Sequence, residues 1–217
     1  MKICSILVFA IITALSAQWT KTSGPPGGKL RSFVSDGYDL YCASGGGGIH
    51  KSTDNGDTWI KTNSGLLSTD AKVLVRKDSM IFTGTDEGGS TWNAKFNGLR
   101  DKYVKSMTVM GNYIFAGTYV NGLYRSSDNG DSWVKVYSPG SDYIYIMDND
   151  GTNVYAATYG DGVMVSENNG DNWEFRNAGL PNLGILNIFA NDSVLLASLA
   201  SDLYRSTDKG LNWTSVI

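Results

Sequence analysis

Apolar and polar residues alternate in short runs that are separated by turns rich in glycine, asparagine and aspartate. The clearest unit covers residues 104–137 and contains four such runs: "VKSMTVM" (104–110), "YIFAGT" (113–118), "GLYRSS" (122–127) and "SWVKVY" (132–137). Alternation over four to seven residues is typical of half-buried β-strands, and Asn-Gly pairs between such runs are typical of hairpins. The unit is therefore predicted to be a four-stranded antiparallel sheet.

This unit recurs along the chain with a period near forty residues. Tryptophans stand at positions 19, 59, 92, 133, 173 and 213, at spacings of 40, 33, 41, 40 and 40. A small residue ends a predicted strand fifteen positions before four of them: Ser44, Thr118, Thr158 and Ser198. This period is typical of a β-propeller, in which each repeat forms one blade. The sequence predicts an all-β propeller of about five blades, preceded by a lone outer strand at 18–22.

One predicted blade is shortened. Only seven residues separate Thr85 from Trp92, whereas fifteen separate Thr118 from Trp133, so the third strand and the turn after it are missing. We expect a three-stranded second blade and an irregular crossing segment between residues 86 and 102. Because this segment departs most from the repeat, Asp86, Glu87 and Arg100 are candidates for ligand binding.

The strands at the two ends of the repeat do not decide how the propeller ring closes. Residues 18–22 offer a spare outer strand, yet the last unit already has its own at 212–217. The alternatives are an open arc of a larger propeller, a self-associating half, or a five-bladed ring with a redundant strand. Unpaired edges would favour self-association.

Four copies of the pattern S-x-D-x-G-x-x-W mark the predicted turn between the third and fourth strands. The aspartate can accept hydrogen bonds from backbone N–H groups about two residues ahead, glycine can take a positive φ, and tryptophan can cover the turn. Each of these roles is structural. The residues are Ser52, Asp54, Gly56 and Trp59; Ser126, Asp128, Gly130 and Trp133; Ser166, Asn168, Gly170 and Trp173; Ser206, Asp208, Gly210 and Trp213.

These motifs resemble the Asp-box, or bacterial neuraminidase, repeat family across nearly the whole chain after residue 17. Three copies match closely, and the copy at 166–173 has Asn168 in place of aspartate. Members of the family include sialidases, sortilin-type receptors, xyloglucanases and photosystem II assembly-factor propellers. The resemblance implies a propeller whose boxes lie away from the catalytic face, and it names no activity.

A glycoside hydrolase, or a fragment of one, is the alternative to a binding module. A sialidase-like enzyme would need an arginine triad, and a xyloglucanase-like enzyme two carboxylates facing one cleft. Arg125 and Arg205 occupy equivalent repeat positions, the Arg-Ile-Pro signature is absent, and Asp161 and Asp202 fall in repeated turns. His50 aligns with strand residues of the other blades and is expected to pack. No catalytic residue is therefore assigned.

Composition changes the picture in three respects. The formal net charge of −3 is scattered along the chain, so nucleic acid is not an expected partner. No zinc or phosphate-loop spacing occurs, and the turn "DNDGTN" at 148–153 lacks the later glutamate of a calcium loop, so no metal or cofactor is expected. Cys42 is expected to act as a small apolar residue, like Ala116, Ala156 and Leu196 in the other repeats.

The N-terminus reads as a secretory signal peptide. Residues 1–17 carry one lysine, an apolar run from Ile3 to Leu15 and then small residues. The run is shorter than the roughly 20 residues that span a bilayer. We expect cleavage after Ala17, a propeller domain over 18–217 with no membrane span, and a secreted, extracellular or periplasmic location.

Tyrosines gather where loops are expected to share one face of the propeller. Tyr119 and Tyr159 follow the second strands of neighbouring blades, and Tyr143 lies in a segment that links blades. Tyrosine offers a flat amphipathic surface to sugars and peptides. The sequence therefore favours a non-catalytic binding module for a protein or glycan, with these three tyrosines, Arg100, Asp86 and Glu87 as candidate contacts.

Overall fold

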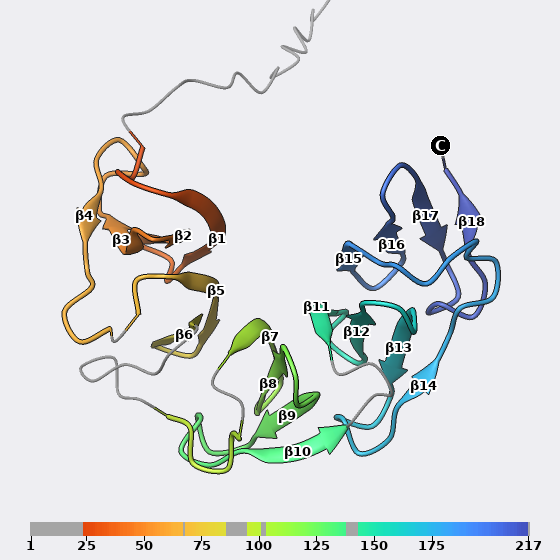
Figure 1. The fold of residues 1–217 in the computed structure, drawn as a ribbon. Helices are drawn as coiled ribbons and strands as arrows, with labels where there is room; N and C mark the ends of the chain where they lie inside the picture. Colours follow the sequence, from red (N-terminus) through yellow and green to blue (C-terminus); the bar gives the residue numbers. More distant parts are fainter. Residues whose placement is uncertain (1–23, 67, 86–94, 101–102, 138–142, 217) are drawn as a thin grey trace, which may run out of the picture.

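The computed structural model describes residues 24–66, 68–85, 95–100, 103–137 and 143–216. All regular elements within these ranges are β-strands, and they form five antiparallel sheets arranged as an arc of blades around a central opening (Figure 1). The all-β propeller predicted from the sequence is confirmed.

Each blade uses its strands in chain order, from the centre of the arc outwards. The first blade contains β1 (Lys29–Ser35), β2 (Leu40–Gly45), β3 (Gly48–Ser52) and β4 (Ile60–Lys61). The second contains β5 (Ala71–Lys77) and β6 (Met80–Thr85). The third contains β7 (Val104–Met110), β8 (Tyr113–Thr118), β9 (Leu123–Ser126) and β10 (Val134–Tyr137).

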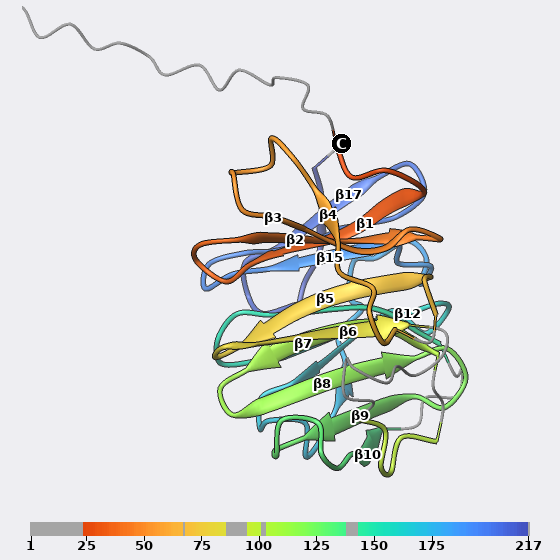
Figure 2. The same ribbon diagram turned by 90° about the vertical axis from the view of Figure 1, so that its left-hand side faces the viewer.

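The last two blades repeat this arrangement. The fourth contains β11 (Ile144–Asn149), β12 (Val154–Thr158), β13 (Val163–Ser166) and β14 (Glu174–Phe175). The fifth contains β15 (Asn187–Ala190), β16 (Leu195–Ser198), β17 (Leu203–Ser206) and β18 (Thr214–Ser215). In the perpendicular view β2, β5, β7 and β8 lie one above another, which is the order of blades 1 to 3 along the arc (Figure 2).

The arc is open. Inner strands of consecutive blades contact each other, namely β1 with β5, β5 with β7, β7 with β11 and β11 with β15. Blades 1 and 5 face each other across a wide gap (Figure 1). The described residues form an open arc and not a closed five-bladed ring, so an arc of a larger propeller and a self-associating half are the two arrangements that stay predictions.

The second blade shows two strands within its described residues. The predicted third strand and most of the irregular crossing, with Asp86 and Glu87, fall on residues 86–94, which lie outside the described part of the chain. The signal peptide at 1–17 and the lone strand at 18–22 also lie outside it.

The pairing of blade 5 corrects one alignment. Leu195 lies opposite Ser206, just as Ile114 lies opposite Ser126. The position of Ala116 is therefore taken by Ala197, and Leu196 is not the equivalent of Cys42. The expectation was wrong because the loop after the second strand is one residue shorter in blade 5. The hydrogen bond from Leu199 N to Asp202 O closes it, whereas the bond from Thr118 N to Gly122 O closes the longer loop of blade 3.

The core lies between blades rather than inside one of them. Met107 and Ile114 of blade 3 pack against Val73 and Phe82 of blade 2. Phe115, on the opposite side of blade 3, packs with residues of blade 4. The sheet of blade 3 is thus apolar on both faces, as expected for stacked repeats. No helix of the described part is long and apolar enough to cross a membrane.

Candidate functional site

Two regions of the propeller carry most of its polar and aromatic contacts. The first consists of the four turns that hold the repeated motif, here called the box hairpins: residues 52–59, 126–133, 166–173 and 206–213. The second is a row of tyrosines on blades 3 and 4. The contacts of the box hairpins link consecutive blades.

Each box hairpin is closed by the same hydrogen bonds. In the third blade Ser126 Oγ donates to Asp128 Oδ1 at 2.8 Å and accepts from Gly130 N at 2.8 Å. The carboxylate then accepts from Ser132 N at 2.9 Å and from Ser132 Oγ at 2.5 Å. We expected the carboxylate to accept from backbone N–H groups about two residues ahead, and this is wrong: its donors belong to Ser132, four residues ahead. The nearer groups Asp128 N and Gly130 N donate to Ser126 Oγ instead.

These hydrogen bonds stabilise the charged carboxylate. Side-chain hydrogen bonds from Thr58, Ser132 and Asn212 are the largest cause, and they hold the pKa of Asp54, Asp128 and Asp208 at about 2. Asn168 reproduces the geometry without the charge, since its Oδ1 accepts from Asn172 N at 2.9 Å. The hairpin needs the acceptor more than it needs the negative charge.

Two consecutive left-handed residues shape each box hairpin. In the third blade Asn129 has φ 56° and Gly130 has φ 84°. The first position tolerates asparagine, which visits this region more readily than most residues. A side chain on Gly130 would meet the carbons of Lys95 at 3.2–3.3 Å and the ring of Phe82 at 3.5 Å, and both residues belong to the preceding blade.

The box tryptophans divide into two kinds. Trp133 Nε1 donates to Lys95 O at 2.9 Å, and Trp213 Nε1 donates to Arg176 O at 2.9 Å, so each reaches the segment that leaves the preceding blade. Trp59 and Trp173 instead donate to glycines of their own hairpins, at 3.0 and 3.1 Å. The sequence predicted that tryptophan covers its own turn, and it missed this link between blades.

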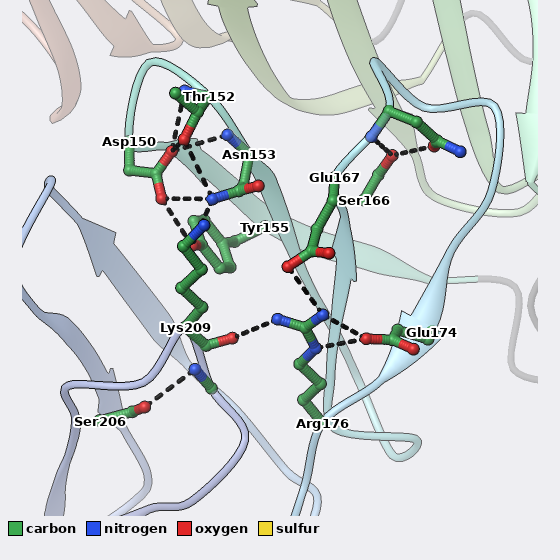
Figure 3. A network of polar contacts seen from close by, with 12 residues as sticks. Asp150, Thr152, Asn153, Tyr155, Ser166, Glu167, Glu174, Arg176, Ser206 and Lys209 are labelled. Carbon is green, nitrogen blue, oxygen red and sulfur yellow. Dashed lines mark hydrogen bonds and ion pairs between the residues drawn. The ribbon is translucent and has the colours of Figure 1, made fainter.

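Cations of one blade reach the box hairpin of the next. Lys95 pairs with Asp131 at 2.5 Å, and Arg125 pairs with Asp171 at 2.7 Å. Arg176 donates to Lys209 O at 2.9 Å and pairs with Glu167 and Glu174 (Figure 3). Burial disfavours the charged Arg176, but the two glutamates outweigh it and raise the pKa of the guanidinium.

The turn between β11 and β12 is held by a local network of its own. Asp150 accepts from Asn153 N at 2.6 Å, from Thr152 N at 2.9 Å and from Tyr155 Oη at 2.7 Å (Figure 3). Burial opposes ionisation, but the hydrogen bonds from Tyr155, Asn153 and Thr152 prevail and lower the pKa of Asp150. Its lone pairs are thus used inside the turn, and no group of three or more potential metal ligands occurs in the described ranges.

Five tyrosines form a continuous series of ring contacts across blades 3 and 4. The tyrosine face, as this set is called below, consists of Tyr103, Tyr119, Tyr143, Tyr145 and Tyr159. Ring centroids lie 5.0 Å apart between Tyr103 and Tyr119, and 4.3 Å apart between Tyr119 and Tyr143, whose planes are at 89°. The series continues from Tyr143 to Tyr159 at 6.5 Å and from Tyr159 to Tyr145 at 6.2 Å.

Backbone pairing places these rings where two segments of each blade meet. Tyr119 N donates to Tyr103 O at 3.1 Å, and Tyr159 N donates to Tyr143 O at 3.3 Å. In both blades the residue after the second strand is therefore tied to the residue before the first strand. Tyr119 is 40% exposed and Tyr159 60% exposed, so the rings remain accessible although they pack on one another.

A β-bulge near the start of the inner strand adds cations to this face. The pairing register shifts at the same point in the first four blades, which leaves Arg31, Lys72, Lys105 and Tyr145 as the extra residues. Bulges re-aim the side chain of the extra residue. Lys72 Nζ lies 5.1 Å from the centroid of the Tyr103 ring, and Lys105 Nζ lies 4.8 Å from that of Tyr145.

The structure brings together only part of the set predicted from the sequence. Tyr119, Tyr143 and Tyr159 share the tyrosine face, whereas Arg100 is exposed in the segment after residue 94, and within the described residues no ring contact or ion pair joins it to them. The sequence missed Tyr103 and Tyr145. Tyr103 could have been found, because it stands before a first strand as Tyr143 does; Tyr145 could not, because its orientation depends on the bulge.

His50 and Cys42 lie opposite each other on β3 and β2 and are fully buried. Burial, followed by the charge of Lys61, lowers the pKa of His50, and burial raises the pKa of Cys42 to about 11. At neutral pH the imidazole is uncharged and the thiol is protonated. This favours the packing role expected for both.

The DUF6242 beta propeller domain matches residues 70–195, which is more than half of the chain. The described residues form an open β-propeller, and the chain belongs to the DUF6242 beta propeller family. No curated protein matches the sequence.

Solved structures share the propeller fold at low identity. An ancestral GH74 enzyme has a TM-score of 0.68 and 21% identity over 93% of this chain and 32% of its own. YCF48 bound to D1 peptide has a TM-score of 0.65 and 15% identity over 90% of this chain and 70% of its own.

An extracellular domain of the one component system BT4673 from B. thetaiotaomicron has a TM-score of 0.65 and 16% identity over 89% of this chain and 28% of its own. The chain spans about a third or less of the GH74 and BT4673 chains. At these identities the likeness establishes the fold.

Proposed function

We propose that this chain is a secreted, non-catalytic interaction propeller that binds an extended peptide or glycan across its tyrosine face. The observation that carries the proposal is the unbroken series of five tyrosine rings on two neighbouring blades, bordered by Lys72 and Lys105. Rings that are restrained by contacts with one another lose little conformational entropy on binding, and they offer both apolar faces and hydroxyl groups.

Three further observations support this proposal. The box hairpins use their carboxylates within their own turns, which fits structural Asp-box repeats rather than four active sites. The first 17 residues have the pattern of a secretory signal, and several similar structures are extracellular domains. YCF48, a propeller of similar fold, has been solved with a peptide bound.

A glycan array and a peptide library, each probed with the purified protein, test the proposal. We expect a ligand whose affinity falls about tenfold in Tyr159→Ala and in Tyr119→Ala, because each variant removes an exposed ring from the face. Tyr38→Ala is the matched control: this tyrosine is 91% exposed and lies in the turn between β1 and β2.

Two results would overturn the proposal. Unchanged affinity in both tyrosine variants would place binding elsewhere on the propeller. Turnover of a fluorogenic glycoside by the wild-type protein would favour the sialidase-like or xyloglucanase-like hydrolase instead.

A further inference from the structure

The bulged inner strands of the first four blades carry one extra residue each, and three of these residues are cations. They are Arg31 in β1, Lys72 in β5 and Lys105 in β7, and the fourth is Tyr145 in β11. Because the inner strands surround the central opening (Figure 1), the extra residues occupy equivalent positions around it.

Two of these cations contact the same position of the next blade. This position lies directly before the inner strand, and it is occupied by Asp70 in blade 2 and by Tyr103 in blade 3. Arg31 of blade 1 forms an ion pair of 3.1 Å with Asp70, and Lys72 Nζ of blade 2 lies 5.1 Å from the centroid of the Tyr103 ring. The cation of one blade therefore meets a carboxylate in one case and a ring in the other.

The carboxylate of blade 2 serves two cations. Asp70 pairs with Arg31 of the preceding blade through one oxygen and with Lys72 of its own blade through the other. Blades 3 and 4 have Tyr103 and Tyr143 at the equivalent position. The exchange of aspartate for tyrosine creates the tyrosine face and removes the acidic partner at the same time.

Lys105 is the bulge cation that this exchange affects. Its Nζ lies 4.8 Å from the centroid of the Tyr145 ring, and it forms no ion pair within the described residues. A ring attracts an ammonium group but does not neutralise its charge. The three N–H donors cannot all point at one ring, so donors remain for an acceptor supplied from outside. Lys105 is partly buried, which reduces the screening of its charge by salt.

The ring planes of the tyrosine face favour a peptide over a sugar chain. Tyr103 and Tyr119 meet at 41°, Tyr119 and Tyr143 at 89°, and Tyr143 and Tyr159 at 62°. Successive sugar rings stack best on flat aromatic faces. Rings at these angles present faces and edges in turn, which suits the separate side chains of an extended peptide.

We propose that the ligand of the tyrosine face is an extended peptide with an acidic side chain, and that this carboxylate pairs with Lys105 as Asp70 pairs with Arg31 and Lys72. The inference rests on the proposed function of this face and adds the charge of its ligand. The whole chain carries a formal net charge of −3, so its overall field does not attract an acidic peptide. The preference comes from the local cation, through a charge-assisted hydrogen bond beside the rings.

Fluorescence polarisation with three labelled probe peptides tests this inference. Each peptide repeats the triplet X-Tyr-Gly, is blocked at both ends and carries glutamate, glutamine or lysine as X. We expect the wild-type protein to bind the glutamate peptide about tenfold more tightly than the glutamine peptide, and the lysine peptide more weakly still. Added salt should weaken binding of the glutamate peptide and leave the glutamine peptide nearly unchanged.

Variants of Lys105 assign this preference to one side chain. Lys105→Gln should lower the affinity for the glutamate peptide to that for the glutamine peptide, Lys105→Arg should keep the preference, and Lys105→Glu should reverse it in favour of the lysine peptide. Lys135→Gln, on the exposed strand β10 of the same blade, is the matched control and should bind as wild type. The melting temperature reports whether each variant is folded.

Tyr159→Ala separates this inference from the proposed function. If this variant loses affinity for both the glutamate and the glutamine peptide, and the wild type binds the two equally, the tyrosine face binds ligands but the inference about charge is wrong. A glutamate preference that survives in Lys105→Gln would also overturn it. So would failure of all three peptides to bind, or binding of oligogalacturonate alone, which would assign the carboxylate to a sugar.

Discussion

At the scale of single residues, the box aspartates illustrate how a hydrogen-bond acceptor and a charge can be separated. Asp128 and Asn168 hold the same positions in neighbouring blades and accept from the backbone N–H four residues ahead at the same distance, 2.9 Å. The same hairpin geometry therefore forms with an ionisable side chain in blade 3 and with a neutral one in blade 4.

Asp128→Asn is expected to lower the melting temperature only slightly at pH 7, whereas Asp128→Ala lowers it clearly because the donors Ser126 Oγ and Ser132 N lose their acceptor. Thermal unfolding followed by circular dichroism measures both. Equal melting temperatures of Asp128→Ala and the wild type would contradict the assigned role.

Acid should weaken the wild-type protein through the same carboxylates. The pKa of Asp128 is lowered from 3.8 to about 2 in the folded state, so its contribution is complete above about pH 4 and is lost as the pH falls towards 2. We expect the melting temperature to fall over this interval, and to fall less steeply in a protein that carries asparagine at positions 54, 128 and 208. Parallel pH profiles of the two proteins would argue against it.

Trp133 and Trp59 should differ in their effect on stability. Trp133 is 6% exposed and bonded to the preceding blade, so Trp133→Ala should cost about 3–5 kcal/mol of unfolding free energy. Trp59 is only partly buried and bonds within its own hairpin, so Trp59→Ala should cost clearly less. Denaturant titration measures both free energies, and a reversed order would contradict the described link between blades.

At the scale of elements, the segments that leave one blade act as supports for the next. Trp133 N donates to Asn97 O, and Trp213 N donates to Ala178 O, each at 2.8 Å. Gly98 and Gly179 follow these acceptors with φ 85° and 94°. A Cβ on either glycine would approach a tryptophan carbonyl oxygen to 2.1–2.2 Å.

Gly98→Ala should therefore destabilise the protein more than Gly111→Ala. Both glycines have a positive φ, which costs alanine about 1 kcal/mol, but Gly111 has no atom within 4 Å of the added Cβ. Chemical denaturation of the two variants isolates the steric part of the cost. A similar loss of unfolding free energy in both variants would mean that the segment around Gly98 moves aside at little cost.

How far the sequence predicts this architecture depends on the range of the contacts involved. The box hairpins could be predicted because their hydrogen bonds close within eight residues and recur four times. The bond from Trp133 to Lys95 spans 38 residues, and its acceptor is a backbone oxygen that carries no side-chain signature. Such a bond could not be predicted from the pattern.

The candidate site was predictable to the same degree. Tyr119 and Tyr159 stand out because their loops repeat, and Tyr143 because it lies between blades. The bulge that aims Lys105 and Tyr145 at the tyrosine face adds one residue to a strand, and alternation alone does not reveal it. The prediction aligned Leu196 with Cys42, one position out of register, because the loop that follows β16 is one residue shorter than the loop that follows β8, and a count back from the box tryptophan does not reveal this.

At the scale of the whole molecule, the two regions have separate tasks. The box hairpins carry the contacts that hold consecutive blades: cations, tryptophans and aromatic rings all reach across them. The tyrosine face carries accessible rings and the cations of the bulges. The two sets share no residue, although Tyr119 of the tyrosine face also contacts Tyr143 of the next blade.

The most direct measurement of this division is the ligand affinity of Tyr159→Ala and Asp128→Ala, each determined together with its melting temperature. We expect Tyr159→Ala to lose about tenfold in affinity with an unchanged melting temperature. Asp128→Ala should bind as wild type at a temperature where it is folded, although it melts earlier. Loss of binding in Asp128→Ala with full binding in Tyr159→Ala would contradict the account.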